Sequence, residues 1–125
     1  MAWNHNIHYH KLLLRLLSPR RERALDAGCG LGEFAVRLAP YFHNVDAIDK
    51  SELMIARAST SLGVPVNIKF RTLDILDKEL PNASYDFISC IAVLHHLPLA
   101  DALRRLSELL HPGGRLAVIG CYKEE

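Results

Sequence analysis

Three glycines at alternate positions and two aspartates carry the clearest chemical signal in this sequence. Gly28, Gly30 and Gly32 lie in the segment DAGCGLG, which begins with Asp26. Glycine has no Cβ, so a loop of this kind lets a ligand approach the backbone closely. Asp49 follows 21 residues after Gly28, at the expected end of the next strand, where a carboxylate can accept hydrogen bonds from both hydroxyls of a ribose. The pattern therefore indicates a ligand that contains adenosine.

The glycine spacing separates two classes of such ligands. A dinucleotide fingerprint, G-x-G-x-x-G, that starts at Gly28 requires a third glycine at position 33, where this chain has Glu33. A glutamate at the start of a helix would also repel a pyrophosphate. S-Adenosylmethionine carries no phosphate, so we expect this cofactor, and an NAD-dependent oxidoreductase is the less favoured alternative.

The elements that position these residues alternate between strands and helices. Strands are expected at residues 24–27, 45–48, 66–70, 85–90 and 115–119, with a turn at 111–114. Helices are expected at residues 6–17, 33–38, 51–62 and 99–110. This alternation predicts an α/β fold with a doubly wound parallel sheet, whose ligands bind beyond the carboxyl ends of the strands. We expect an N-terminal helix and linker at 1–23 and a cofactor-binding domain at 24–125.

Composition limits the classes of partner. The formal net charge is +1, so no strong field favours nucleic acid or an anionic membrane. No apolar run reaches the roughly 20 residues that span a bilayer. The three cysteines form no C-x-x-C pair, which indicates free thiols and a cytoplasmic protein. The histidines at positions 5, 8 and 10 have no nearby cysteine or carboxylate to complete a metal site, so no metal is expected.

Five segments together resemble the class I S-adenosylmethionine-dependent methyltransferases. They are LDAGCGLGEFAVRLA (25–39), AIDKSELMIARA (47–58), LDILD (73–77), YDFISCIAVLHHL (85–97) and LHPGGRLAVIG (110–120). The resemblance covers nearly all of the chain after residue 24. It implies a Rossmann-like fold and transfer of a methyl group to a small-molecule acceptor, with S-adenosylhomocysteine as product. A binding module that keeps the cofactor site without catalysis is an alternative.

The resemblance also implies roles for residues around the methionyl part of the cofactor. Asp26 would reach toward the ammonium, and Tyr9 or His10 of the N-terminal helix would contact the carboxylate. His95 would lie near the reaction centre as the candidate base, although His95 and His96 could instead simply pack at a strand end. The remaining residues implied on this side are Gly28, Cys29, Gly30, Gly32, Cys90 and Ile91.

The adenosine end is implied to lie over a second group of residues. Asp49 would hold the ribose, and Lys50 and Met54 would flank the adenine. Asp74 would accept a hydrogen bond from the adenine amine, with the Ile75 N–H facing the ring. The alternative for Asp74 is an ordinary acid in a solvated loop.

The family's full sheet has strand order 3-2-1-4-5-7-6, whereas this chain ends soon after the fifth expected strand. The resemblance therefore indicates a chain truncated after order 3-2-1-4-5. Leu116, Val118 and Ile119 would then lie on a bare sheet edge, and such edges favour pairing with another chain. We expect a homo-oligomer through this edge.

Overall fold

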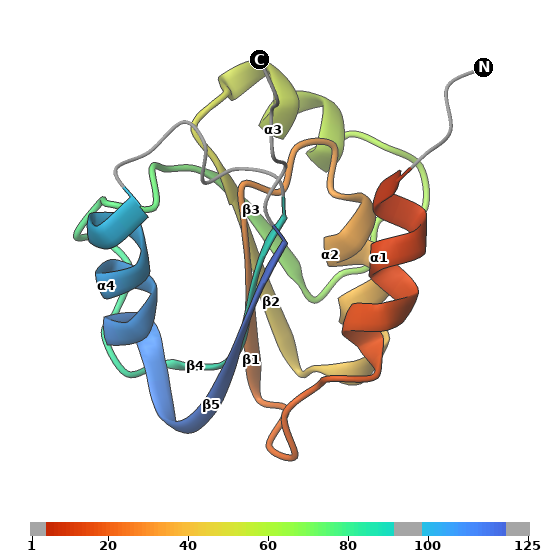
Figure 1. The fold of residues 1–125 in the computed structure, drawn as a ribbon. Coiled ribbons are helices and arrows are strands. Elements are labelled where there is room, and N and C mark those ends of the chain that lie inside the picture. The colour runs from red at the N-terminus through yellow and green to blue at the C-terminus, as the bar shows by residue number, and fades with distance from the viewer. Residues whose placement is uncertain (1–4, 92–98, 120–125) are drawn as a thin grey trace.

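Among the described residues, five parallel strands form one sheet. The structure is a computed structural model, and it describes residues 5–91 and 99–119. The strands are β1 (Arg23–Ala27), β2 (Asn44–Asp49), β3 (Ile68–Thr72), β4 (Tyr85–Ile91) and β5 (Leu110–Ile119). The helices are α1 (His5–Leu14), α2 (Glu33–Leu38), the 3-10 helix η1 (Ala39–Tyr41), α3 (Glu52–Ser59) and α4 (Leu99–Leu109). The order β3-β2-β1-β4-β5 confirms the predicted Rossmann-like doubly wound sheet (Figure 1).

Each face of the sheet carries a hydrophobic core, because successive side chains of a strand point to opposite faces. In β1, Ala24 packs into the core beneath α1 and α2, whereas Leu25 packs into the core beneath α4. Figure 1 shows α1 and α2 on one face of the sheet and α4 on the other. Leu13 and Leu17 are buried in the α1–α2 core, so the N-terminal segment packs directly onto the sheet.

The first helix is shorter than the sequence predicts. α1 ends at Leu14 rather than at residue 17. The amides of Arg15 and Leu16 donate to carbonyls three residues earlier, at 3.1 and 2.9 Å, and this tighter pattern is typical of a helix terminus.

None of the helices in the described ranges is long and apolar enough to cross a membrane.

The helix after β2 also ends early. Ser51 caps its start by accepting a hydrogen bond from the Met54 amide at 3.3 Å. Its last residue is Ser59, whereas the sequence predicts a helix that extends to residue 62 and is closed by Gly63. The Thr60 hydroxyl donates to the carbonyl of Ala56 at 2.8 Å. Such side-chain bonds compete with continuation of the helix.

The third strand lies two residues later than predicted. β3 spans Ile68–Thr72 because it pairs with β2 from Val45 to Asp49. Val66, predicted to begin this strand, lies outside it with a fully exposed side chain. The alternation of apolar residues predicts a strand in this segment, but pairing with β2 determines where that strand begins.

The turn predicted at 111–114 forms a bulge inside β5. Tyr85 pairs with Leu110, and Phe87 pairs with Arg115. β5 therefore advances by five residues while β4 advances by two, which leaves extra residues outside the ladder. Gly113 has a φ of 84° within this bulge, a conformation that glycine adopts without strain.

Two buried carboxylates at the amino ends of the strands are fully engaged. Asp46 accepts hydrogen bonds from the Arg23 guanidinium at 2.9 Å and from the Tyr85 hydroxyl. Asp86 accepts from the backbone N–H groups of residues 22 and 23 at 2.9 and 3.1 Å, and pairs with Arg20 at 3.2 Å. Buried carboxylates are stable only with such partners, so this end of the sheet is a structural network.

Candidate cofactor site

The glycine loop joins β1 to α2 and contains three left-handed residues, with φ of 75° at Gly28, 56° at Gly30 and 83° at Gly32. Gly30 and Gly32 differ in the space around them. A Cβ built on Gly32 would lie 2.9 Å from the ring of Phe70, whereas one built on Gly30 would meet nothing within 4 Å. Gly32 is therefore required for close packing against the sheet, and Gly30 leaves open space beside the loop.

Asp49 links this loop to the neighbouring strand. It ends β2, and its Oδ2 accepts a hydrogen bond from the Gly30 amide at 2.9 Å. Its Oδ1 accepts from the Ser51 amide at 2.9 Å. The carboxylate thus fixes both the glycine loop and the entry to α3. The predicted juxtaposition of Asp49 with the loop is present in the structure.

Asp26, at 2% exposure, is buried beneath the loop. The Ser89 hydroxyl donates to its Oδ1 at 3.0 Å. Burial raises the pKa of Asp26 to about 7, and the nearby charge of Asp49 adds to the rise, while hydrogen bonds from Ser89 and the Ala35 backbone oppose it. The group therefore lies near its titration midpoint at neutral pH.

A cavity of about 120 Å³ lies beside the glycine loop. Five residues predicted for the methionyl side line it, namely Asp26, Gly28, Cys29, Gly30 and Ile91. Gly32 and Cys90 are not among its lining residues, because Gly32 faces Phe70 and Cys90 is buried in the core beneath α4.

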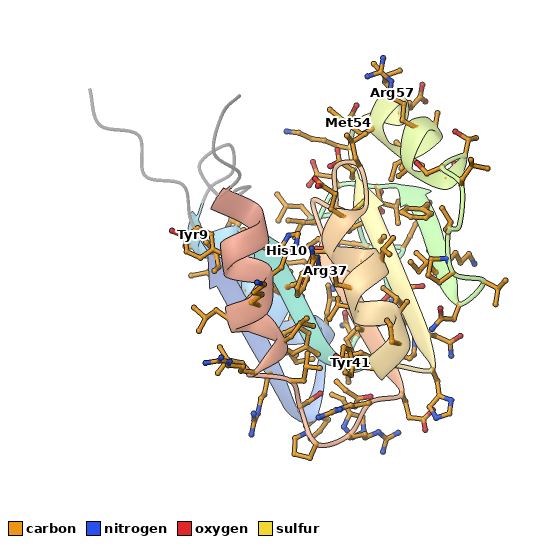
Figure 2. All side chains as sticks on the ribbon, turned by 90° about the vertical axis from the view of Figure 1, so that its right-hand side faces the viewer. Tyr9, His10, Arg37, Tyr41, Met54 and Arg57 are labelled. Carbon is orange, nitrogen blue, oxygen red and sulfur yellow. The ribbon has the colours of Figure 1, made fainter. Side chains whose placement is uncertain are left out.

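The N-terminal helix supplies one wall of the cavity through His10. Figure 2 shows His10 directed from α1 toward α2, while Tyr9 extends from the other side of the helix. Of the two residues predicted from α1, His10 lines the cavity and Tyr9 does not. His10 lies three residues before Leu13, which is buried in the α1–α2 core, so the two residues share the face of α1 that packs on the sheet.

Three further lining residues were not predicted from the sequence. Leu31, Glu33 and Phe34 belong to the glycine loop and the first turn of α2. Their positions inside a predicted ligand-binding loop were the available signal. Among the described residues, no group of three or more His, Cys, Asp or Glu side chains could hold a metal ion.

The residues predicted around the adenine lie between β2 and α3, in the first turn of α3, and on the loop after β3. Lys50 is exposed, and Met54 in the first turn of α3 is 36% exposed. Asp74 Oδ1 accepts from the Leu76 amide at 3.0 Å, which closes a local turn. The Ile75 side chain is buried in the core beneath α4, so only its backbone is available to a ligand.

Arg105 of α4 holds the loop that carries Asp74. Its guanidinium donates to the carbonyls of Asp77 and Leu80 at 3.1 and 2.9 Å, and to the side chain of Asn82. A guanidinium carries five N–H donors in a fixed planar arrangement, so one side chain can bind several points of the loop. The loop is therefore positioned by the helix on the α4 face.

The cysteine thiols near the site are not activated. Burial, followed by the charges of Asp26 and Asp49, raises the pKa of Cys29 far above its usual range. Burial raises the pKa of Cys90 to about 12. Both thiols stay protonated at neutral pH, which supports the interpretation of Cys29 as a small residue that saves space. His95, predicted as a base, lies outside the described residues.

The geometry places a glycine loop, a strand-end carboxylate and a cavity at the carboxyl ends of parallel strands, and residues 24–114 match the methyltransferase domain family. The chain belongs to this family. Membership confirms the resemblance to class I S-adenosylmethionine-dependent methyltransferases and favours a methyl donor over the dinucleotide alternative.

Two relatives and one solved structure are similar to the chain over part of their length. An uncharacterised methyltransferase of Mycobacterium bovis is 41% identical over 94% of this chain and 59% of its own length. The 27-O-demethylrifamycin SV methyltransferase of Amycolatopsis mediterranei is 35% identical over 78% of this chain and 38% of its own length. The N-methyltransferase NodS of Bradyrhizobium japonicum, crystallised with S-adenosylhomocysteine, is 29% identical with a TM-score of 0.80 over 90% of this chain and 60% of NodS. This chain thus spans between 38% and 60% of the length of these proteins.

Proposed function

We propose that this chain binds S-adenosylmethionine and forms the cofactor-binding part of a methyltransferase for a small-molecule acceptor. The observation that carries the proposal is the 2.9 Å hydrogen bond from the Gly30 amide to Asp49, which holds the carboxylate against the glycine loop. An ionised carboxylate has about four lone-pair positions. The amides of Gly30 and Ser51 occupy two of them, and the remaining two can accept the ribose hydroxyls.

The other residues of the site fit the rest of this cofactor. The open space at Gly30 leaves the loop backbone free for close approach. Asp26 supplies a buried acid beside the cavity, suited to an ammonium group. Under this proposal, Lys50 and Met54 flank the adenine, and Asp74 with the Ile75 amide binds its edge.

When bound, the cofactor supplies a methyl group on a positively charged sulfur, which is already a good leaving group. The protein then has mainly to bind and orient the two reactants, an effect that can contribute roughly 7–11 kcal/mol. A base is required only where the acceptor must lose a proton, and His95 is proposed for that case. A relative named for a demethylrifamycin substrate supports a small-molecule acceptor, as does a net charge of only +1.

Isothermal titration calorimetry with S-adenosylmethionine, S-adenosylhomocysteine and NAD tests the binding step. We expect both adenosyl ligands to bind and NAD to bind far more weakly. Asp49→Ala is expected to weaken S-adenosylhomocysteine binding more than tenfold, because the variant loses both ribose contacts and the loop attachment. Asp101→Ala removes an exposed carboxylate on α4 and serves as the control that keeps wild-type affinity.

Preferential binding of NAD, or unchanged affinity in the Asp49 variant with a normal melting temperature, would contradict the proposal.

A screen of candidate acceptors by product mass then separates a methyltransferase from a binding module without catalysis. A mass gain of one methyl group on any acceptor identifies the enzyme.

A further inference from the structure

A second cavity lies toward the amino ends of β1, β2 and β3, away from the glycine loop. Its volume is about 380 Å³, within the roughly 300–1,000 Å³ of small-molecule sites. Three of its lining residues are cations, namely Arg23, Lys69 and Arg71, and one lining residue, Asp46, is an acid. The cavity therefore has the size of a ligand site and an excess of positive charge.

Strand alternation places the three cations on one face of the sheet. Ile68 and Phe70 of β3 pack against the α1–α2 core. Lys69 and Arg71 alternate with them and therefore face the α4 side. Arg23 faces the same side, because the residue after it lies in the α1–α2 core. Parallel strands covered on both faces are normally apolar on each, so these cations mark a part of the sheet that is not packed against apolar side chains.

Most hydrogen-bond donors of these cations are not used within the protein. The Arg23 guanidinium donates from Nη2 to Asp46 at 2.9 Å, and that of Arg71 donates from Nη2 to Glu79 at 2.9 Å. A guanidinium carries five N–H donors, so each has several left. The Lys69 ammonium has no hydrogen bond or ion pair with any residue in 5–91 and 99–119.

The acids beside the cavity do not compensate Lys69. Asp46 lies opposite Lys69 in the β2–β3 ladder, but its carboxylate is engaged by Arg23 and by the Tyr85 hydroxyl. Glu79 pairs with Arg71, and its side chain is 60% exposed. The whole chain carries a net charge of only +1, so this excess is a local feature. It is complementary to a compact anion with several acceptor oxygens.

We infer that this cavity binds the phosphate group of a small phosphorylated molecule. Lys69 supplies the main ionic contact, and the unused N–H groups of Arg23 and Arg71 supply further donors, since a guanidinium matches phosphate geometry. The volume leaves room for an organic part beside the phosphate. A nucleic acid needs many cations along an extended surface, whereas these three converge on one cavity. Asp49 lies at the other end of β2, so the inference is independent of the proposed function.

NMR titration of the isotope-labelled protein with inorganic phosphate and with ribose 5-phosphate tests the inference, at an ionic strength held constant with NaCl. We expect saturable shifts of amides at 44–46 and 67–71 and none at 28–32. Lys69→Ala should weaken both ligands about tenfold, the effect of losing one hydrogen bond to a charged group. Because Lys69 is exposed, the variant should keep the wild-type melting temperature.

Lys78→Ala is the matched control. Lys78 is also an exposed lysine, but it lies on the loop after β3 and lines a different cavity. Its removal lowers the net charge by the same amount and should change either affinity less than twofold. Equal weakening by Lys69→Ala and Lys78→Ala would show only a diffuse positive field and would overturn the inference.

Glu79→Gln provides a signature that a purely structural network would not give. The change releases Arg71 from its acid and should tighten phosphate binding about twofold to threefold, the size of an exposed ion pair. Shifts that are absent or do not saturate in the wild-type protein overturn the inference. Tighter binding of a single-stranded oligonucleotide than of ribose 5-phosphate also overturns it, because the cations would then belong to a nucleic-acid surface.

Discussion

Both ends of the sheet hold buried carboxylates, but the carboxylates at the two ends differ in how many partners they have. At the amino ends, Asp46 and Asp86 are each engaged by at least one arginine and by further donors. At the carboxyl ends, Asp26 has the Ser89 hydroxyl and no ion pair with a described residue, and His10 beside it has an unpartnered nitrogen. The first arrangement stabilises the fold, and the second costs stability and leaves polar groups available to a ligand.

The pH dependence of stability distinguishes the two ends most strongly. Asp26 has a folded pKa of about 7 against a reference of 3.8. Its contribution to stability is therefore complete below about pH 4 and is lost as the pH rises to 7. Asp26→Asn cannot ionise, so its unfolding free energy relative to wild type should rise by about 1.4 kcal/mol per pH unit in this window, about 4 kcal/mol in all.

Urea denaturation of both proteins at several pH values measures this difference. The comparison between variant and wild type cancels the titration of the other acids. A flat difference between pH 4 and 7 would show that Asp26 is not held protonated in the folded protein.

Removal of an acid at the amino ends should reduce stability without affecting binding. Asp46→Ala leaves Arg23 and the Tyr85 hydroxyl without their partner. We expect a loss of about 2–3 kcal/mol, below the roughly 3–5 kcal/mol of a fully buried pair, because the Arg23 side chain is 37% exposed. Affinity for S-adenosylhomocysteine should be unchanged below the melting transition, and a tenfold loss would contradict the division between the two ends.

Two glycines of one loop provide a matched pair for stability and binding. Gly32→Ala should reduce the unfolding free energy by about 2 kcal/mol, because it combines a left-handed backbone with a Cβ 2.9 Å from the Phe70 ring. Gly30→Ala should cost only about 1 kcal/mol, since its Cβ meets no atom. For S-adenosylhomocysteine affinity the order should be reversed, with the larger loss at Gly30. Equal effects on both quantities would contradict the assignment of packing to one glycine and ligand approach to the other.

The smallest expected effect concerns the edge of the sheet. β5 pairs with β4 on one side, and no strand within 5–91 and 99–119 pairs with its other side. We predict self-association through this edge at high protein concentration, measured by light scattering after size exclusion. Val118→Lys should reduce it, since a charge on an edge strand opposes pairing. Leu103→Lys on α4 is the control, because the side chains of Leu103 and Val118 are similarly exposed, at 36% and 37% respectively. A monomer at all concentrations would disprove the association.

The alternation of strands and helices and the placement of Asp49 beside the loop could be predicted from the sequence itself, because short apolar runs and glycine turns are local signals, whereas the strand order followed from the resemblance to the methyltransferases. The sequence was not sufficient for the bounds of β3, which depend on pairing with β2, or for the bulge in β5, which depends on the register with β4. The choice between Tyr9 and His10 required the orientation of α1, which packing against α2 determines. The roles of individual residues toward the cofactor stay predictions.

The attachment of the 74–82 loop by Arg105 limits how this protein can diversify. From α4, the guanidinium donates hydrogen bonds to three residues of that loop, namely Asp77, Leu80 and Asn82. An insertion there would detach the loop from α4 and displace Asp74, whereas the side chains of Leu62 and Val66 are fully exposed, so an insertion between them would disturb little packing. New surface features can therefore be added at 61–66, for instance a label or an affinity tag, while the length of the 74–82 loop must be preserved.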